Sequence, residues 1–318
     1  MRRRVTLALI LPLLACVELP QTALDHGPDR ADAAARPLTG AEDSAPAPLR
    51  IGTWNVRKLG FEQDKDVAGI ATSIAQHFDL VALVEVMWTP DDAHYTALAA
   101  ALGPSWQLTR TATPRPNLRS PHAEYYVVAT RSARVGPCRE AATLEYVRDG
   151  EGSDDSAERG LFLREPAIGC FRTRGPGAGN DFALAVYHAE WGDGSPSGIA
   201  SEVAHLDVTF QAMRERFPQE RQHFLLGDLN LDSAALAPLT SARDRTRGQG
   251  STLDAEGERS QHLYDHLLAY GRAADQALID DAEVLDLRGE AFDPKHFRQR
   301  VSDHLPLLAR LRVGPDDD

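Results

Sequence analysis

Residues 223–232, with the sequence HFLLGDLNLD, constrain the fold more than any other segment of the chain. The apolar run at 224–226 predicts a short buried strand that Gly227 breaks. Asp228 and Asn230 follow two residues apart, so strand alternation predicts that their side chains lie on the same side of the backbone. A carboxylate and an amide at the end of a buried strand suit a metal or phosphate site. The alternative is a polar turn, because Gly, Asp and Asn are also turn residues.

Other segments have the same construction, in which an apolar strand meets a polar residue at its end. Polar groups at strand ends converge on one edge of a layered α/β domain, where binding sites are usually built. Each residue alone has an ordinary interpretation as a turn residue, a helix-terminal charge, a core histidine or part of a solvated loop. Their joint occurrence indicates a single site. The residues are Asn55 after 49–54, Glu85 after 80–84, His188 after 182–187, and Asp303 with His304 before a last strand.

The order of the predicted elements indicates an α/β (α+β) fold. Strands and helices alternate irregularly with several strand-to-strand passages, which fits two mixed β-sheets packed face to face with helices outside. Apolar residues at helical spacing predict helices over 67–78 and 199–213, and 92–102 is predicted to be a helix that Gly103 and Pro104 stop. Residues 241–259 are predicted to form a polar loop, and we find no internal repeat.

The overall charge limits which partners the whole molecule can attract. The 318 residues carry a formal charge of −13, so the molecule as a whole should not attract nucleic acid or anionic lipid. A phosphate-handling site would need bound cations or a local positive rim. One such segment is 104–123, which has no acidic residue but contains Arg110, Arg115 and Arg119.

The first residues predict a targeting segment. Three arginines at 2–4 precede an apolar stretch at 5–15 that is too short to span a bilayer. The stretch ends at Cys16 in a sequence that resembles a bacterial lipobox, whose cysteine is lipidated. The alternative is an ordinary secretory signal with a chance cysteine. We therefore expect a lipoprotein-type signal peptide at 1–16, a disordered tether at 17–48 and a catalytic domain at 49–318, exported and lipid-anchored to a bacterial membrane (outer membrane or cell surface), or otherwise secreted.

Two cysteines remain after Cys16. An exported chain permits a disulfide between Cys138 and Cys170, and two free, buried thiols are the alternative, because sequence cannot place the two Cα atoms.

The residue types at the strand ends predict a hydrolytic site. Mg²⁺ takes oxygen ligands and keeps several waters, so one or two carboxylates suffice, and Glu85 with Asp303 is the natural pair. His188 and His304 suit proton transfer, because an unperturbed imidazole titrates near ~6.5. Each imidazole needs a partner that fixes its tautomer, and Glu124 and Asp265 are the candidates.

Eight motifs in this order resemble the endonuclease/exonuclease/phosphatase superfamily, and its deoxyribonuclease I branch in particular. The resemblance spans residues 49–313, and the order of the motifs is more specific than any one of them. The motifs are LRIGTWNVRKLG with Asn55, LVALVEV with Glu85, AEYYVVATR with Glu124, REPAIGCF from Arg164, LAVYHAEWGD with His188, LLGDLNLD with Asp228 and Asn230, LYDHLL with Asp265, and VSDHLPLLARL with Asp303 and His304.

The resemblance implies a four-layer sandwich that cleaves phosphoester bonds. It implies that Glu85 mainly holds Mg²⁺, or Mn²⁺ in its place, with Asn55 and Asp303 nearby. His304, backed by Asp265, would act as the base.

The same resemblance implies roles for the remaining motif residues. His188, backed by Glu124, would act as the acid. Asp228 and Asn230 would position the phosphate and the water, and Arg164 and Asn55 would contact the substrate. Products would carry 5′-phosphates.

Other parts of the chain resemble the branch only in part. An acidic loop with Asp149, Asp154 and Asp155 resembles the branch's calcium loop, but the branch's cysteine pair is missing there, and a solvated charge run is the alternative. The basic residue two positions after the metal glutamate, which the branch inserts into the minor groove, is Met87 here, and the branch's sugar-packing aromatic is His122. These departures predict altered engagement of duplex DNA.

The resulting functional hypothesis is a divalent-metal-dependent, deoxyribonuclease I-like endonuclease that acts on DNA as a monomer. The first alternative is a phospholipid or phosphoinositide phosphatase, or a sphingomyelinase-like phosphodiesterase, of the same superfamily. The second alternative is a non-catalytic surface lipoprotein.

Overall fold

The computed structural model describes residues 46–62, 64–116, 122–139, 144–148, 161–191, 201–289 and 292–315. Residues Ser44–Asp318 form one compact unit. Several predictions lie outside the described residues: the signal segment with Cys16, the tether as far as residue 45, Arg119, the calcium-loop residues Asp149, Asp154 and Asp155, and the first residues of the helix predicted from 199.

The first sheet is built around two long parallel strands. β1 (Leu49–Leu59) pairs in parallel with β2 (Leu80–Met87) and antiparallel with β15 (Leu307–Leu311). The order of the described strands is β12-β14-β15-β1-β2-β5-β3, and β4 pairs with β5. The other members are β3 (Trp106–Arg110), β4 (Arg115–Pro116), β5 (Ala123–Arg131), β12 (Thr246–Arg247) and β14 (Ala282–Val284).

The second sheet has the segment at 223–232 near its middle. β10 (His223–Asp228) pairs in parallel with β9 (Asp181–His188) and antiparallel with β13 (Asp265–Tyr270). The order of the described strands is β11-β13-β10-β9-β8-β6, and β7 pairs with β8. The remaining members are β6 (Val135–Pro137), β7 (Glu145–Tyr146), β8 (Ala167–Thr173) and β11 (Arg243–Asp244).

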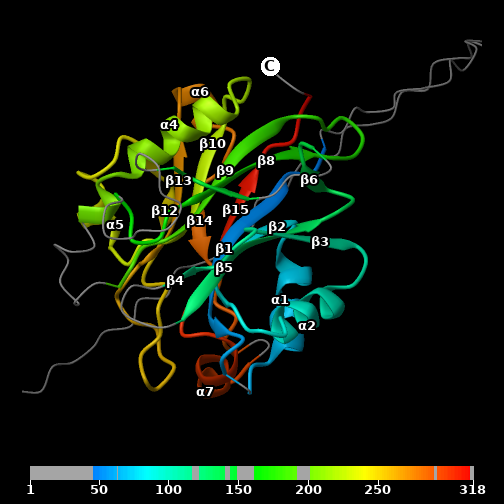
Figure 1. Ribbon diagram of the computed structural model, residues 1–318, viewed down its shortest axis with the longest axis vertical. Helices are drawn as coiled ribbons and strands as arrows, with labels where there is room; N and C mark the ends of the chain where they lie inside the picture. Colours follow the sequence, from blue (N-terminus) through cyan, green and yellow to red (C-terminus); the bar gives the residue numbers. More distant parts are fainter. Residues whose placement is uncertain are drawn as a thin grey trace, which may run out of the picture. The chain divides into compact units, whose positions relative to one another are not determined.

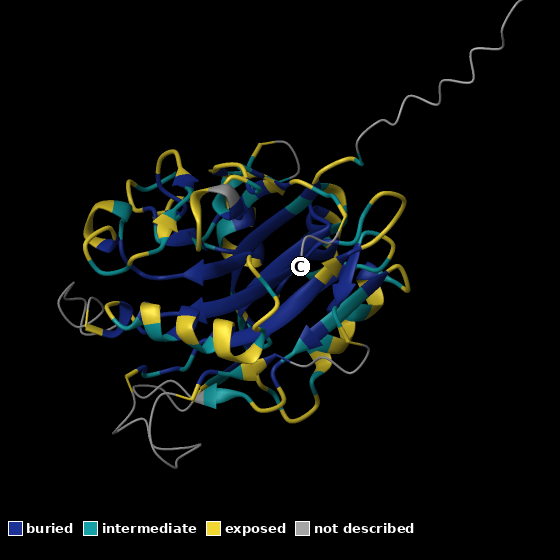
Figure 2. Ribbon diagram, turned by 90° about the horizontal axis from the view of Figure 1, so that it is seen from above, coloured by how far each residue is buried: buried dark blue, intermediate teal, exposed yellow. Residues whose placement is uncertain are grey.

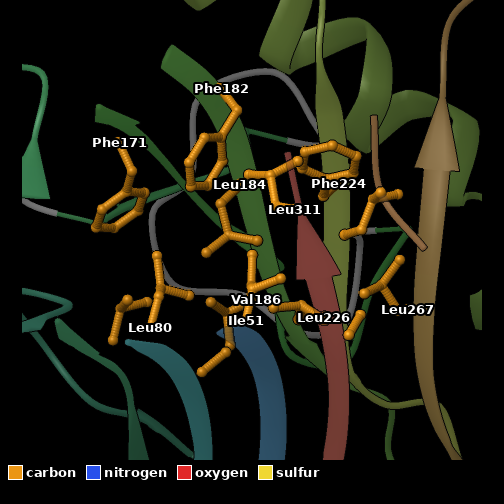
Figure 3. Packing of buried hydrophobic residues seen from close by; sticks show 14 of the residues in the cluster. Ile51, Leu80, Phe171, Phe182, Leu184, Val186, Phe224, Leu226, Leu267 and Leu311 are labelled. Atoms are coloured by element: carbon orange, nitrogen blue, oxygen red, sulfur yellow. The ribbon is translucent and has the colours of Figure 1, made fainter. Parts of the chain in front are cut away.

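The two sheets pack face to face through alternate apolar residues of their strands. Ile51 and Leu80 from the first sheet meet Leu184, Val186 and Leu226 from the second, all fully buried (Figure 3). The central strands of both sheets are largely buried, and exposed residues gather on loops and on the outer faces of helices (Figure 2). This packing forms the central core.

Helices cover both outer faces, which completes four layers (Figure 1). α1 (Val67–His77) and α2 (Ala93–Leu102) pack on the first sheet, and α4 (Leu206–Arg216) packs on the second. α1 begins at Asp66, whose carboxylate accepts the N–H of Gly69 at 2.8 Å, as is typical of an N-cap. The predicted four-layer sandwich of two mixed sheets is confirmed. The short helical segments are α5 (Ser233–Leu236), α6 (Ala273–Gln276), α7 (Pro294–His296) and the π-helical turn η1 (Phe297–Val301).

Three predictions about elements are wrong in detail. Gly227 does not end its strand but lies within β10, and it must be glycine because a Cβ there would overlap the carbonyl oxygen of Tyr187 on β9. The predicted polar loop at 241–259 contains β11 and β12, whose two-residue length leaves no alternation for a sequence pattern to show. The long helix predicted from 199 is interrupted by a turn at 204–205, and α4 begins only at Leu206.

A disulfide joins Cys138 and Cys170, whose Cα atoms are 5.4 Å apart, and it ties the end of β6 to β8. Within the described residues, no helix combines the length and the apolar character that crossing a bilayer requires.

Candidate active site

The strand register of the second sheet places three predicted site residues side by side. Asp228, the last residue of β10, pairs with His188 at the end of β9 and with Asp265 at the start of β13. Paired residues on neighbouring strands project to the same face. Segments far apart in the sequence therefore deliver two carboxylates and an imidazole to one edge of the sheet, as the predicted convergence requires.

The first sheet contributes Asn55 and Glu85 through irregularities rather than strand ends. β1 continues to Leu59 and β2 continues to Met87, so the prediction that these strands end at the polar residues is wrong. The pairing register shifts after Asn55 and around Glu85, and Glu85 has a φ of 59°, in the left-handed region. Such bulges re-aim side chains, and strained residues persist where the surroundings hold them.

Asn55 connects the two sheets within the site. Its Nδ2 donates to Oε1 of Glu85 and to Oδ2 of Asp228, each at 3.0 Å. Its Oδ1 accepts the backbone N–H of Arg57 at 2.8 Å, which fixes the orientation of the amide. Asn55 thus offers its nitrogen to the carboxylates. Ligation of a cation by its Oδ1 stays a prediction, because that oxygen would have to give up its bond to the N–H of Arg57.

His304 lies between two carboxylates. Its Nδ1 is 2.7 Å from Oδ2 of Asp265, and its Nε2 is 3.6 Å from Oδ2 of Asp228. Burial disfavours the imidazolium, but the charges of Asp265 and Asp228 outweigh it and raise the pKa of His304 well above its ordinary value. The backbone N–H of His304 donates to the Ser302 hydroxyl at 3.0 Å, which holds the loop in place.

His188 has the opposite electrostatic environment. Burial, together with the charge of Arg164, lowers the pKa of His188 to about 4, although Asp228 acts against the shift. Its Nδ1 is 2.9 Å from Oε1 of Glu124, and its Nε2 is 4.0 Å from Oδ2 of Asp228. Two imidazoles whose environments push their pKa values apart are typical of an acid–base pair.

The protonation of the two histidines bears on the predicted roles. The charged form of His304 can donate a proton, and the neutral form of His188 can accept one. The predicted roles are the reverse, with His304 as base and His188 as acid. A cation near the carboxylates would offset the charge that favours the imidazolium, so the assignment of acid and base stays a prediction.

Glu124 is the centre of a buried charge network. Its Oε1 forms an ion pair with Arg164, and its Oε2 accepts the N–H of Glu85 at 2.7 Å. Arg164 is buried and also lies 3.5 Å from Glu190 and 3.3 Å from the carbonyl oxygen of Ala189. The network orients His188 and holds the backbone of Glu85. Arg164 is engaged inside the protein, so its predicted contact with substrate stays a prediction.

Asn230 does not lie on the same strand face as Asp228. The strand ends at Asp228, and Asn230 has a φ of 52° beyond it. Its backbone N–H donates to Oδ1 of Asp228 at 2.9 Å, and its amide donates to the carbonyl oxygen of Ala189 at 2.8 Å. The predicted alternation of Asp228 and Asn230 is wrong because a local turn replaces the strand, although the turn still brings Asn230 into the site.

The donor set at this edge fits a hard divalent cation. Asp228, Asp265 and His304 offer ligand atoms within 4.8 Å of one another. Oδ1 of Asp265 is buried and has no hydrogen-bond partner among the described residues, as expected of a carboxylate oxygen that awaits a polar or charged partner. Glu85 is joined to Asp228 through Asn55, whereas Asp303 lies 3.5 Å from Nε of Arg57. The predicted pairing of Glu85 with Asp303 at a cation stays a prediction.

A pocket of about 220 Å³ opens at Glu85 and His188, and its lining does not include Asp228, Asp265 or His304. Its lining includes Glu85, Glu124, Arg164 and His188. Three further lining residues have no role predicted from the sequence: Lys58, Glu190 and Trp191. Met87 and His122, the two departures from the deoxyribonuclease I branch, also line it. Trp191 follows His188 by three residues, which is the one signal in the sequence that could have marked it.

Trp191 belongs to a row of aromatic side chains, which we call the aromatic shelf (Trp191, Tyr264 and His262). The Trp191 side chain is 49% exposed, and its ring lies 5.6 Å from that of Tyr264. Tyr264 stacks in turn on His262 at 4.9 Å with an interplanar angle of 21°. The aromatic shelf therefore leads outward from the catalytic pocket.

Comparisons with known proteins agree with this geometry. A family model described as the endonuclease/exonuclease/phosphatase family matches residues 52–304. A protein of Thioalkalivibrio sp. (strain K90mix) named deoxyribonuclease is 30% identical over 278 residues, which cover 83% of this chain and 71% of that protein.

Solved structures show the same fold at low sequence identity. An endonuclease/exonuclease/phosphatase from Bacteroides vulgatus has a TM-score of 0.58 at 16% identity, over 84% of this chain and all of that one. The TDP2 protein of D. rerio, solved in complex with a single strand DNA product, has a TM-score of 0.55 at 17% identity, over 83% of this chain and 99% of that one.

Proposed function

The chain belongs to the endonuclease/exonuclease/phosphatase family, and on that premise we propose that it is a divalent-metal-dependent nuclease that hydrolyses DNA to products with 5′-phosphates. The observation that carries the proposal is the facing pair of imidazoles. Each has its own carboxylate partner, Glu124 for His188 and Asp265 for His304, and both approach the same oxygen of Asp228.

The reaction needs an attacking water, a proton acceptor and a proton donor. One histidine accepts the proton of the water as it attacks phosphorus, and the other protonates the leaving oxygen. Glu124 and Asp265 keep the Nδ1–H of each ring engaged, so that Nε2 faces the reacting groups. Asp228 and Asn230 lie where they would position the water and the phosphate.

Glu85, with Asn55 bonded to it and Asp303 as the predicted second carboxylate, would hold Mg²⁺ or Mn²⁺. The bound cation would polarise the phosphate and offset the charge that develops in the transition state. The acidic side chains alone would repel a phosphodiester, which explains why a chain with a net charge of −13 needs a cation at this site.

The aromatic shelf supports nucleic acid over a phospholipid head group as the substrate. Exposed aromatic faces next to a catalytic pocket suit the stacking of nucleobases, which contributes about 1–3 kcal/mol per base. Met87 in place of a basic residue removes a contact to the minor groove. The chain's relative from Thioalkalivibrio is named a deoxyribonuclease, which also supports DNA.

The test is a substrate panel with purified protein and Mg²⁺. We expect nicking and degradation of plasmid DNA that EDTA stops and that His304→Ala lowers by about 10²-fold or more. Phospholipid vesicles should release no head groups. Intact plasmid with the wild-type protein, or equal degradation by wild type and His304→Ala, would refute the nuclease. Head-group release without DNA cleavage would instead identify a phospholipid-directed member of the family.

The cellular placement is a separate proposal. We propose export and lipid attachment at Cys16, supported by the positively charged start, the short apolar stretch and the lipobox-like end. Radiolabelled palmitate should enter the wild-type protein and not Cys16→Ser, and the variant should lose its membrane association. Unchanged labelling of Cys16→Ser would contradict the anchor. The outcome of this experiment does not bear on the nuclease proposal. Ca²⁺ binding at Asp149, Asp154 and Asp155 is likewise a separate expectation, which a Ca²⁺ titration would test.

A further inference from the structure

A second polar pocket lies at the far end of the strands that carry the catalytic residues. β10 runs from His223 to Asp228 and β13 from Asp265 to Tyr270, and the register pairs His223 with Tyr270. The five steps between the first and last of six strand residues, at ~3.3 Å each, separate the two ends by about 16 Å. This pocket has a volume of about 490 Å³ and shares no lining residue with the catalytic pocket, so the two are distinct. Its lining residues include Arg214 of α4, Asp275 of α6 and Tyr270 of β13, and α4 and α6 lie near one end of the second sheet (Figure 1).

His223 lines this pocket without an internal partner. The side chain is 4% exposed, and neither ring nitrogen has a hydrogen-bond partner among the described residues. An unsatisfied buried polar group destabilises a fold by about 1–3 kcal/mol, so buried groups of this kind normally have a partner. The ring of Tyr270 meets the imidazole edge-on at 6.4 Å and offers it only a carbon surface. A ligand in the pocket could supply the missing partner.

The charged groups around His223 are mainly positive. Among the described residues that line the pocket, three arginines come from three separate segments, and Asp275 is the single acid. Both oxygens of Asp275 accept from Arg272, at 2.9 and 3.2 Å. The arginines are Arg214 of α4, Arg221 before β10 and Arg272 before α6.

Packing holds one of these guanidinium groups over the pocket. Arg214 lies 5.2 Å from the ring centroid of Tyr270, and Phe210 stacks on Tyr270 at 4.8 Å with an interplanar angle of 12°. A positioned guanidinium loses less conformational entropy when it binds an oxyanion than a mobile one does. Although the chain has a net charge of −13, three arginines at one opening make the local charge favourable for an anion.

The protonation state of the His223 imidazole suits the binding of an oxyanion. Burial and the charge of Arg214 lower the pKa of His223 to about 4, against the smaller opposing effects of the Arg221 backbone and Asp275. At neutral pH the ring is therefore uncharged and has one N–H donor. An oxyanion would accept that N–H and would also neutralise the arginine charges nearby.

We propose that this pocket binds a phosphate-type oxyanion, either inorganic phosphate or a phosphate monoester, through its arginines and the ring N–H of His223. Guanidinium forks match the oxygens of phosphate, and a dianion balances the excess positive charge better than a carboxylate or a diester does. The site is independent of the proposed nuclease activity, because the reacting phosphate binds at the opposite end of the strands.

The test follows the His223 resonance by NMR in protein labelled at histidine, with His223→Gln to assign it. Inorganic phosphate and methyl phosphate are titrated into the metal-free protein at pH 7.5 and constant ionic strength, with chloride as the reference. We expect a saturable shift of the His223 signal with a Kd of about 1 mM or tighter. No shift beyond that caused by chloride would overturn the proposal.

Variants distinguish this site from phosphate binding at the catalytic pocket. Arg214→Gln should weaken the titration of His223 by roughly tenfold, the effect of one charge-assisted hydrogen bond. Arg216→Gln is the matched control, because Arg216 lies on the same helix but pairs with Glu145 instead, and it should leave the titration within about twofold of wild type. Arg214, Arg221 and Arg216 are exposed, so their variants should fold. Titration of His223 as tight as in wild type, both in Arg214→Gln and in the Arg214→Gln, Arg221→Gln double variant, would exclude the arginines as ligands and refute the site.

Discussion

Nδ1 of His304 lies 2.7 Å from Oδ2 of Asp265, although 39 residues separate them in sequence. The contact fixes which ring nitrogen carries the proton toward the carboxylate and which one faces Asp228. We expect Asp265→Asn to lower kcat by about 10²–10⁴-fold with little change in KM, because an amide can hold the ring in the wrong tautomer without altering the pocket. Steady-state cleavage of a fluorescent oligonucleotide measures both constants.

The control for this variant is Asp280→Asn, which removes an exposed carboxylate that does not belong to the site. It should behave as wild type. Circular dichroism and thermal unfolding of Asp265→Asn should show a folded protein. A kcat within threefold of wild type would contradict the catalytic role of the contact.

Glu85 provides a test of the cation. Glu85→Gln keeps one oxygen, which can accept either from Asn55 or from the N–H of Lys58, and because the side chain is only partly buried the fold should persist. The loss of charge should raise the Mg²⁺ concentration for half-maximal activity by at least about tenfold. Titration of activity with Mg²⁺, alongside calorimetry of Mg²⁺ binding, measures this. Unchanged Mg²⁺ binding by Glu85→Gln would move the cation to the other carboxylates, Asp228 and Asp265.

The layers of the fold and the residues that gather at the site could be predicted from the sequence, because both follow from the pattern of apolar and polar residues. Buried strands are continuous apolar runs, so a polar residue within or after them, such as His188 or Asp228, is conspicuous. The resemblance then supplied partners such as Glu124 for His188, which no local pattern could have paired.

The geometry of the bulges could not be predicted in the same way. Glu85 adopts a left-handed φ without being glycine or asparagine, because the carboxylate of Glu124, 39 residues away, holds its N–H. Likewise, Ser302 accepts from His304 and donates to the carbonyl oxygen of Asn55 at 2.6 Å, a contact set by tertiary structure alone. Trp191 and the pocket around His223 were not predicted, because their meaning comes from neighbours that are distant in sequence.

Arg164 tests the buried charge network. Its removal leaves Glu124 and Glu190 buried without their cation, so Arg164→Met should lower the free energy of unfolding by about 3–5 kcal/mol. The matched control is Arg216→Met, whose partner Glu145 is about half exposed, and it should cost no more than about 1 kcal/mol. Urea denaturation of both variants gives the comparison. Similar losses of unfolding free energy in the two variants would show that the buried Arg164 network contributes no more stability than the exposed ion pair of Arg216.

Trp191 tests the aromatic shelf as a binding surface. Trp191→Ala should raise KM for single-stranded DNA by roughly five- to a hundredfold, because one base loses its stacking partner, while kcat changes little. Trp191→Phe keeps an aromatic face and should restore most of the affinity. Parallel assays on duplex DNA should show a smaller effect, since paired bases are not free to stack. A fall in kcat without a change in KM would instead place Trp191 in the chemistry.

His266 makes stability depend on pH. Its Nδ1 lies 3.2 Å from Oδ2 of Asp244 and its Nε2 lies 2.7 Å from the carbonyl oxygen of Leu231, so both nitrogens face acceptors. Burial disfavours the charge, but Asp244 outweighs it and raises the pKa of His266 above its ordinary 6.5. Burial likewise opposes the shift at Asp244, but the bond to His266 lowers the pKa of Asp244 to about 2.

The two shifts define the pH range over which the pair stabilises the fold. A raised histidine pKa contributes stability that is complete below pH 6.5 and is lost as the pH rises through the folded value. A lowered aspartate pKa contributes stability that is present above 3.8 and is lost as the pH falls toward 2. The difference in unfolding free energy between wild type and His266→Gln should therefore be largest near pH 5–6 and shrink as the pH rises to 9. His94→Gln, at a half-buried histidine on α2, serves as the control, and a difference that stays constant from pH 5 to 9 would show that His266 is not charged in the folded protein.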